Sequence, residues 1–374
     1  MYWQLHDRGF LPTPDLVTRL DEGTFEPIER LAADLPALVY ARRFREVATE
    51  RLRAPIDWQA LAEDGSGPRS ERLFMLFSYF ASAFIHSPGL PPIQRLPQEI
   101  AVPLVYLGET CGRPPILSYA SYCLHNWRRV DPAGPVAIGN LKLLQNFSPP
   151  GEGKEDEDWF ILVHVEIEAR AGAALRAVAD TRRILAEADG AGIERLLGAV
   201  AGSLAEMNRT LIRMPEGCRP EVYFLKVRPY IFGFENVVYA GCFDGAPQSY
   251  RGETGAQSSI VPALLAALGI EHKNTLLTSH LEEMRKYMPP AHRQFLLDQV
   301  GVRDFVKSHA SYGGGRLTAL YNDCLQEVLA FRSRHFEYAV NYIEKKVDNP
   351  LATGGTPYIP WLKQLIEETK AYRL

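Results

Sequence analysis

Helical periodicity dominates the second half of the sequence and leaves few folds open to it. Apolar residues recur there at steps of three and four positions, as on one face of an α-helix. The segments with this pattern are 159–187, 190–213, 258–269, 276–288, 292–299 and 316–346. The most strand-like segment is 221–232, but Pro229 argues against an uninterrupted strand. We therefore predict a mainly α fold with a large all-helical domain at 159–374.

The first 147 residues differ from the rest, because short helical stretches alternate there with helix breakers. The clearest helix is a nearly continuous apolar run at 70–86, which is typical of a buried helix. A polar, acidic segment, SPPGEGKEDED, follows at 148–158. With 374 residues, the chain exceeds the roughly 250–300 residues of a single core. We expect a small mixed N-terminal domain with few strands (1–147), a linker (148–158) and the large helical domain.

Composition argues against several classes of protein. The net charge is −4 and no basic stripe is visible, so we expect neither a nucleic acid nor a membrane partner. The five cysteines form no CxxC pair, which is typical of free thiols in a reducing cytoplasm. The N-terminal MYWQLHDRGF lacks the apolar core of a signal peptide. We expect a cytoplasmic protein and, without an exposed apolar stripe, a monomer.

Most catalytic signatures are missing from the sequence. It contains no GxGxxG motif that opens a helix, and no GxxxxGK[ST], HExxH or GxSxG motif. The nine histidines are scattered, without the helical spacing of a multi-histidine metal site. A haem site is still possible, because haem takes one axial imidazole from the protein and four nitrogens from the porphyrin.

His335 is the best candidate for such a single ligand. It belongs to a helical stripe of apolar and aromatic residues: Leu320, Cys324, Val328, Phe331, His335, Tyr338 and Tyr342. The pattern places His335 in the interior. A hydrogen-bonded core histidine and a haem ligand both fit this position, and periodicity does not choose between them.

The chain also resembles the indoleamine 2,3-dioxygenase family over nearly its whole length. The matching stretches are RGFLP at 8–12, PPILSYASYCLHNW at 114–127, GAQSSI at 255–260, MRKYMPPAHRQFL at 284–296, RSRHFEYAVNYI at 332–343 and ATGGT at 352–356. The fourth motif is long and unusual, and the motifs occur in the family's order. The resemblance therefore favours a haem ligand at His335.

This resemblance implies a large helical domain capped by a small N-terminal domain, with haem b between them. It also implies a reaction in which ferrous haem and O2 cleave the C2–C3 bond of the indole ring of L-tryptophan. The product is N-formylkynurenine. The cofactor does the hard chemistry, while the protein orients the substrate and excludes water.

Roles for individual residues follow from the same resemblance. Arg228, in FLKVRPY, matches the arginine that binds the substrate carboxylate, and a guanidinium suits two-point carboxylate recognition. Arg332 lies one turn before His335, where it can pair with a haem propionate. The remaining matched positions are Tyr119, Phe160 and Tyr223 around the indole, Phe224 on the same turn, Thr254 and Gly255 beside the distal haem face, and Thr353 on a loop that closes over the amino acid.

The sequence departs from the animal members of the family at several positions. His164, our candidate catalytic residue, replaces a distal serine and resembles the histidine with which tryptophan 2,3-dioxygenases accept the indole N–H. We expect it to hold this N–H as a neutral imidazole and not to act as a general base. Leu265 stands where animal members place an acid near the haem edge. Tyr122 and Cys123 alter the pocket floor.

Three alternatives to a tryptophan dioxygenase stay open at this point. The first is a related haem enzyme that acts on a substituted tryptophan or indole in secondary metabolism. The second is a haem protein without enzyme activity, such as a gas sensor or carrier. The third is a helical scaffold without a cofactor, in which His335 is an ordinary core residue.

Overall fold

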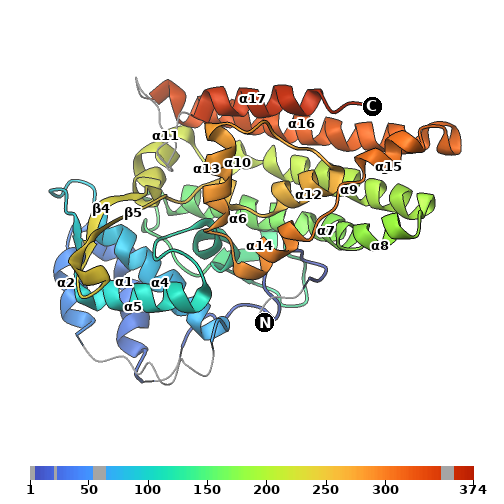
Figure 1. Cartoon of the computed structure of the whole chain (residues 1–374). Helices are drawn as coiled ribbons and strands as arrows, with labels where there is room; N and C mark the ends of the chain where they lie inside the picture. The colour runs from blue at the N-terminus through green and yellow to red at the C-terminus, as the bar shows by residue number, and fades with distance from the viewer. Residues whose placement is uncertain (1–4, 21–22, 54–64, 347–357) are drawn as a thin grey trace.

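The computed structural model describes residues 5–20, 23–53, 65–346 and 358–374, and helices dominate this part of the chain (Figure 1). The predicted mainly helical fold is thereby confirmed. The longer helices are α1 (Glu26–Tyr40), α4 (Pro68–Ile85), α5 (Gln98–Cys111), α6 (Lys154–Arg170), α9 (Gly190–Leu211), α13 (Leu276–Arg285), α16 (Arg316–Tyr342) and α17 (Tyr358–Lys370). The shorter ones include α2 (Phe44–Arg51), α7 (Gly172–Ala179), α8 (Thr181–Ala186), α10 (Met214–Gly217), α11 (Pro220–Val222), α12 (Ile260–Leu268), α14 (Pro290–Leu297) and α15 (Arg303–Ser308).

The apolar run at 70–86 forms α4, as predicted. Every residue of α4 from Ser70 to Phe84 is buried, and the helix packs against α5. Its two charged residues in this stretch are paired: Arg72 donates to Glu29 at 2.7 Å, and Glu71 accepts from Arg113. Buried charges persist in a core when they are paired in this way. This helix is the centre of the N-terminal core.

Short strands connect the two halves of the sequence. β1 (Arg95–Leu96) pairs in parallel with β4 (Phe234–Tyr239), and β4 pairs antiparallel with β5 (Pro247–Tyr250). A second pair joins β2 (Trp127–Arg129) and β3 (Leu141–Leu143). Figure 1 shows β4 and β5 beside α1, α2 and α5. The segment 159–374 is therefore not all helical, because two of its strands lie with the N-terminal helices.

The ambiguous segment 221–232 is helical and not a strand. It contains the end of α11, a π-helical turn (η3, Tyr223–Val227) and a 3-10 turn (η4, Arg228–Ile231). Pro229 lies at the start of η4, where its missing N–H costs little. Four of the β-branched and aromatic residues that suggested a strand are buried here, namely Tyr223, Val227, Tyr230 and Ile231, so tertiary packing overrides their propensity.

The segment expected to be a linker contains the beginning of α6. Lys154–Asp158 already belong to this helix, and Asp156 and Glu157 within it are buried. Glu157 accepts backbone N–H groups of Phe147 and Ser148 at 3.0 and 3.2 Å, and burial raises its pKa to about 8. The acidic residues thus fasten the helix start to the preceding chain. The division into two domains itself stays a prediction.

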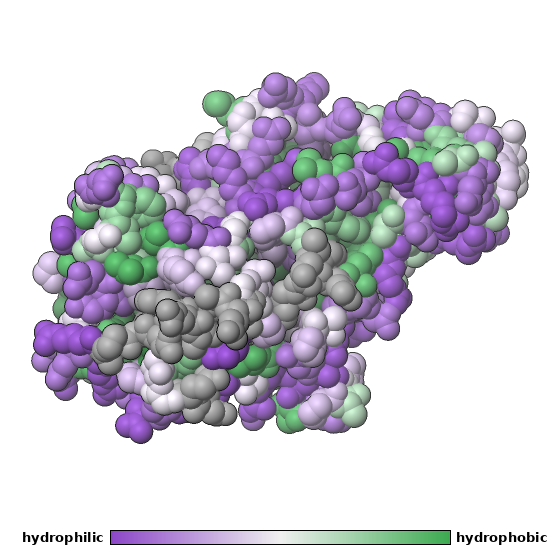
Figure 2. All heavy atoms as spheres, turned by 60° about the horizontal axis from the view of Figure 1, so that its bottom comes forward, coloured by the Kyte–Doolittle hydropathy of each residue, from purple (hydrophilic) through white to green (hydrophobic). Residues whose placement is uncertain are grey.

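The C-terminal half is a layered helical assembly. α16 packs against α9 and α17, and α9 also packs against α6 and α7 (Figure 1). Within the described ranges, no helix is long and apolar enough to cross a membrane. On the face shown in Figure 2, hydrophilic residues predominate and apolar side chains form small separate groups. Scattered exposed apolar residues of this kind are ordinary on a protein surface.

Candidate functional site

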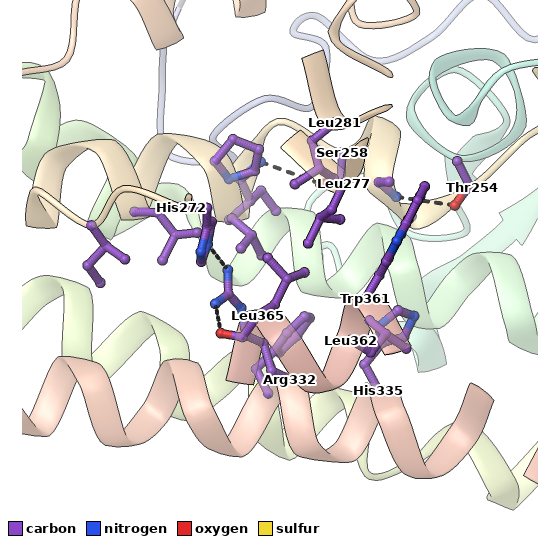
Figure 3. Close-up of a pocket in the computed structure, with 18 of the residues that line it drawn as sticks. Thr254, Ser258, His272, Leu277, Leu281, Arg332, His335, Trp361, Leu362 and Leu365 are labelled. Atoms are coloured by element: carbon purple, nitrogen blue, oxygen red, sulfur yellow. Dashed lines mark hydrogen bonds between the residues drawn. The ribbon is translucent and has the colours of Figure 1, made fainter. Parts of the chain in front are cut away.

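A large cavity lies between α16 and α17 on one side and α6, α13 and the segment 253–262 on the other. Its volume is about 1320 Å³. Pockets for single small ligands usually measure about 300–1,000 Å³, so this cavity has room for a large flat group and a second, smaller molecule. Figure 3 shows Arg332 and His335 rising from α16 into it, with side chains of α17 nearby.

His335 projects from α16 into this cavity. Its side chain is exposed to the cavity, and it makes no hydrogen bond to another described residue. The surrounding protein desolvates the ring, and this burial, together with the nearby His164, lowers the pKa of His335 to about 4. A neutral imidazole with a free lone pair is the form that binds a metal.

These observations fit the predicted haem. An axial ligand needs a neutral imidazole that faces an open space, and a core histidine would instead have its ring nitrogens satisfied. The other members of the predicted stripe that line the cavity are Phe331, Tyr338 and Tyr342. In the described part of the chain, no group of three or more His, Cys, Asp or Glu side chains is arranged to hold a metal ion directly.

The opposite wall brings together four residues that the sequence analysis singled out. Tyr119, Phe160, His164 and Tyr223 all line the cavity. The Phe160 ring lies 4.7 Å from the His164 ring and 4.9 Å from the Tyr223 ring, between ring centroids. Tyr119 packs edge-on against His164 at 6.0 Å. This arrangement is an aromatic pocket suited to a flat bicyclic ring.

The hydrogen bond of His164 fixes its tautomer. Its Nδ1 lies 2.7 Å from the backbone carbonyl oxygen of Phe160, which is an acceptor. Nδ1 must therefore carry the proton, and Nε2 retains its lone pair. Burial lowers the pKa of His164, so the ring is neutral at neutral pH. His164 thus offers the cavity an acceptor for an N–H group.

The loop that begins η6 (Gly255–Gln257) forms another part of the wall. Thr254 and Gly255 both line the cavity, as expected from the sequence. The Thr254 hydroxyl accepts the backbone N–H of Ala256, and this contact caps the turn (Figure 3). Gln257 anchors the loop from behind, since its side chain accepts the Tyr119 N–H at 2.9 Å and donates to Gly252 at 2.9 Å.

Arg228 and Phe224 do not belong to the cavity lining. The Arg228 guanidinium is buried, with its central carbon 5.6 Å from the Phe224 ring and 4.6 Å from the Phe232 ring. Burial raises the pKa of the neighbouring Tyr223, which does line the cavity, and the Arg228 charge opposes part of this rise. Arg228 therefore lies directly behind the aromatic wall. Thr353 lies outside the described residues.

Arg332 is engaged by the protein itself. It donates to the carbonyl of Leu365 at 2.7 Å and to the Thr369 hydroxyl, and it contacts His272 Nε2 at 2.9 Å (Figure 3). His272 in turn contacts Glu368 at 2.7 Å. Leu265 lines the cavity but offers no carboxylate, and the described partners of Arg332 are Leu365, Thr369 and His272. The predicted propionate contact of Arg332 stays a prediction, while its visible role is to fasten α16 to α17.

The sequence analysis missed two buried acids beside the cavity, Glu168 and Glu253. Glu168 lies one turn after His164 on α6, and its Oε1 accepts the hydroxyls of Tyr119 at 2.9 Å and Ser258 at 2.8 Å. One carboxyl thus joins α6, Tyr119 and the distal loop. The sequence did contain a signal for Glu168, because an acidic residue within an apolar helical run indicates a buried carboxyl. Glu253 is buried and lines the cavity directly.

Replacement of Glu168 by leucine is expected to destabilise the protein by about 2–3 kcal/mol, because two buried hydroxyls lose their acceptor. Thermal unfolding of the purified protein measures this loss. The matched variant Glu168→Gln keeps an acceptor and is expected to stay close to wild type. An unchanged midpoint for Glu168→Leu would contradict this bracing role.

Glu168 also predicts a pH dependence of stability. Burial raises its pKa to about 7 in the folded state, above the value of about 4.3 for an unperturbed glutamate. The folded state therefore holds the proton more tightly, and its contribution is lost as pH rises from the lower value through the higher one. Glu168→Gln should flatten this part of the denaturation profile. An identical slope in wild type and variant would show that Glu168 does not titrate there.

Comparison with known proteins agrees with this geometry. The model of the family described as indoleamine 2,3-dioxygenase matches residues 2–350. Mouse indoleamine 2,3-dioxygenase 1 is 33% identical, over 97% of this chain and 93% of that protein. The Aspergillus candidus indoleamine 2,3-dioxygenase acdA is 31% identical, over 97% and 94%. A myoglobin of Haliotis madaka is 30% identical, over 97% and 96%.

Proposed function

The chain belongs to the indoleamine 2,3-dioxygenase family, and from this premise we propose that it converts L-tryptophan and O2 into N-formylkynurenine. The cofactor is haem. One observation carries the proposal: His335, neutral and exposed to the cavity, faces an aromatic pocket that contains His164. A ligand for iron and a binding surface for an indole thus share one enclosed space.

In this proposal His335 holds the haem iron, which supplies the binding and activation of O2 when the cofactor is present. The remaining work of the protein is to orient the substrate and to exclude water. Neutral His335 would hold the iron, and the largely apolar and aromatic side chains of α16 and α17 that line the cavity would contact the macrocycle. Arg332 supports this part of the cavity wall by joining the two helices.

The indole ring fits between Tyr119, Phe160 and Tyr223, which form the aromatic wall. His164 Nε2 would accept the indole N–H, and this bond would fix the orientation of the indole ring within the pocket. Arg228 binds the carboxylate in this proposal, which requires a rearrangement, because its guanidinium packs on Phe224 and Phe232 and does not belong to the cavity lining. For Thr353 we propose the role that the family resemblance implies, on a loop that closes over the amino acid.

Replacement of His164 by alanine is expected to raise the dissociation constant of L-tryptophan about tenfold, because an unpaired buried donor costs about 1–3 kcal/mol. Binding is followed by the change in the Soret band of the ferrous–CO form. For 1-methyl-L-tryptophan, which has no indole N–H, the same substitution should not weaken binding. A tenfold loss for both ligands would contradict the N–H contact.

The central test uses the haem-loaded protein. It is reduced without oxygen, mixed with L-tryptophan and then exposed to O2, and the absorbance and mass of N-formylkynurenine are followed. Appearance of this product supports the proposal. A product of different mass from a substituted tryptophan, and none from L-tryptophan, would indicate the related enzymes of secondary metabolism.

The Haliotis myoglobin relative favours a second candidate, a haem protein that binds gas without turnover. Such a protein needs His335 but has no need for His164 or Arg228 as ligands of an amino acid. A ferrous–CO Soret band that L-tryptophan does not change, together with no product, would favour this candidate.

A further inference from the structure

Neutral groups surround the guanidinium of Arg332. It donates to the carbonyl oxygen of Leu365 at 2.7 Å, to the Thr369 hydroxyl, and to Nε2 of His272 at 2.9 Å (Figure 3). The side chain is only 7% exposed, yet it belongs to the cavity lining. A guanidinium has five N–H groups, so these contacts leave some of them for a ligand in the cavity.

The charge of Arg332 has no direct acidic partner within the part of the chain that the structure describes. Its acceptors are a carbonyl, a hydroxyl and an imidazole. The carboxylate that acts on its charge belongs to Glu368, on the other side of His272. A buried cation is costly unless an anion contacts it directly. A ligand that brings a carboxylate into the cavity would therefore complete the pairing.

His272 bridges the two charges with its two ring nitrogens. Nδ1 lies 2.7 Å from a carboxylate oxygen of Glu368 and must donate, while Nε2 accepts from Arg332 and must keep its lone pair. Burial and the Arg332 charge lower the pKa of His272, in agreement with a neutral imidazole. Gln364 donates to the other oxygen of Glu368 at 2.8 Å, so the acid is fixed from both sides. A chain of contacts thus runs from α17 through His272 to α16.

The proposed iron ligand lies close to this chain of contacts. Arg332 precedes His335 by one turn of α16, so both side chains lie on one face of the helix and enter the same cavity (Figure 3). Of the other arginines in the lining, Arg303 packs on the Tyr372 ring and Arg285 is exposed. Haem carries carboxylate groups at the edge of its macrocycle, and the guanidinium beside His335 suits such a group.

We propose that His272 is a positioning residue for the cofactor, which holds the Arg332 guanidinium in place for a carboxylate of the bound haem. The inference rests on the haem site of the proposed function. It adds roles for His272 and Glu368, which lie outside the sequence motifs that match the family. A cluster that only fastens α16 to α17 would support every macrocycle equally. A cluster that positions Arg332 supports a macrocycle according to its carboxylates.

The experiment compares haem with its dimethyl ester, in which both carboxylates are masked. Each ferric macrocycle is loaded into the purified protein, its Soret band is verified, and its rate of transfer to an excess of apomyoglobin is measured. The variants are His272→Phe, which keeps a ring without nitrogen, His272→Gln, which keeps an acceptor and a donor, and Arg332→Leu. His309→Phe, outside the cavity lining and stacked on Phe305, is the control for loss of an imidazole.

We expect wild type and His309→Phe to release the dimethyl ester at least about tenfold faster than haem, because the ester has no charge for the guanidinium to bind. His272→Phe should reduce this ratio to within about twofold of that of Arg332→Leu, and the double variant should show no further change, since both substitutions act through one guanidinium. His272→Ala, which needs no space for a ring, should give the same ratio. His272→Gln should keep most of the wild-type ratio.

Three results would overturn the inference. Equal acceleration of both macrocycles by His272→Phe would show that the cluster only fastens the helices. Equal release of both macrocycles by wild type would show that no carboxylate is bound, while the ligand role of His335 stands. A loss of preference for L-tryptophan over tryptamine in His272→Phe, with an unchanged haem ratio, would assign the guanidinium to the substrate carboxylate. If wild type gives no Soret band with either macrocycle, the haem site of the proposed function fails first, and the role of His272 fails with it.

Discussion

Replacement of His335 by alanine is expected to abolish both haem binding and dioxygenase activity. The imidazole is exposed to the cavity, neutral, and without a hydrogen bond to another described residue, so its removal deletes the proposed iron ligand and little else. We expect the Soret band and the haem content of the purified protein to fall to background. Circular dichroism should show an unchanged helical fold, because the side chain projects into the cavity and its removal disturbs little protein packing.

Two controls separate ligand loss from general damage. His309→Ala removes an imidazole that stacks on Phe305, outside the cavity lining, and should keep the haem and the activity. Added imidazole should partly restore the haem spectrum of His335→Ala, because a small ligand can enter the space that the side chain leaves. A variant that retains a five-coordinate haem spectrum without added imidazole would rule out His335 as the ligand.

Replacement of Arg228 by alanine is expected to lower kcat/KM for L-tryptophan by about tenfold to 150-fold. A hydrogen bond to a charged group contributes about 1.5–3 kcal/mol, which gives this range. Tryptamine has no carboxylate, so its binding should change little. Steady-state kinetics and Soret titrations with both ligands measure the difference.

The surroundings of Arg228 sharpen this prediction. Its guanidinium lies against the rings of Phe224 and Phe232, which favour a cation on their faces. Arg228→Lys keeps the charge but loses the planar fork, so it should recover part of the affinity. Lys226→Ala, at a half-exposed ion pair with Glu152, is the control for loss of one positive charge on the same turn. Equal effects on L-tryptophan and tryptamine would remove Arg228 from the carboxylate site.

Much of the fold was predictable because helical periodicity is local. A nearly continuous apolar run identified α4, and steps of three and four residues identified α16 and placed His335 on its interior stripe. The strand-like composition of 221–232 suggested the wrong secondary structure, because local propensity carries no information about the helices that pack on this segment. The expected linker was likewise polar in sequence but partly buried in the structure.

The sequence by itself determined the helical class, the family motifs and the candidate iron ligand, because each depends on residue type and short spacing. Only the tertiary structure decided the hydrogen-bond partners. The Phe160 carbonyl sets the tautomer of His164, Leu365 and Thr369 engage Arg332, and one carboxyl of Glu168 joins Tyr119 to Ser258. These contacts, apart from the first, join residues far apart in the chain, and burial changes the proton affinity of their groups. Both effects arise when distant segments meet around a cavity, so the sequence pattern alone does not contain them.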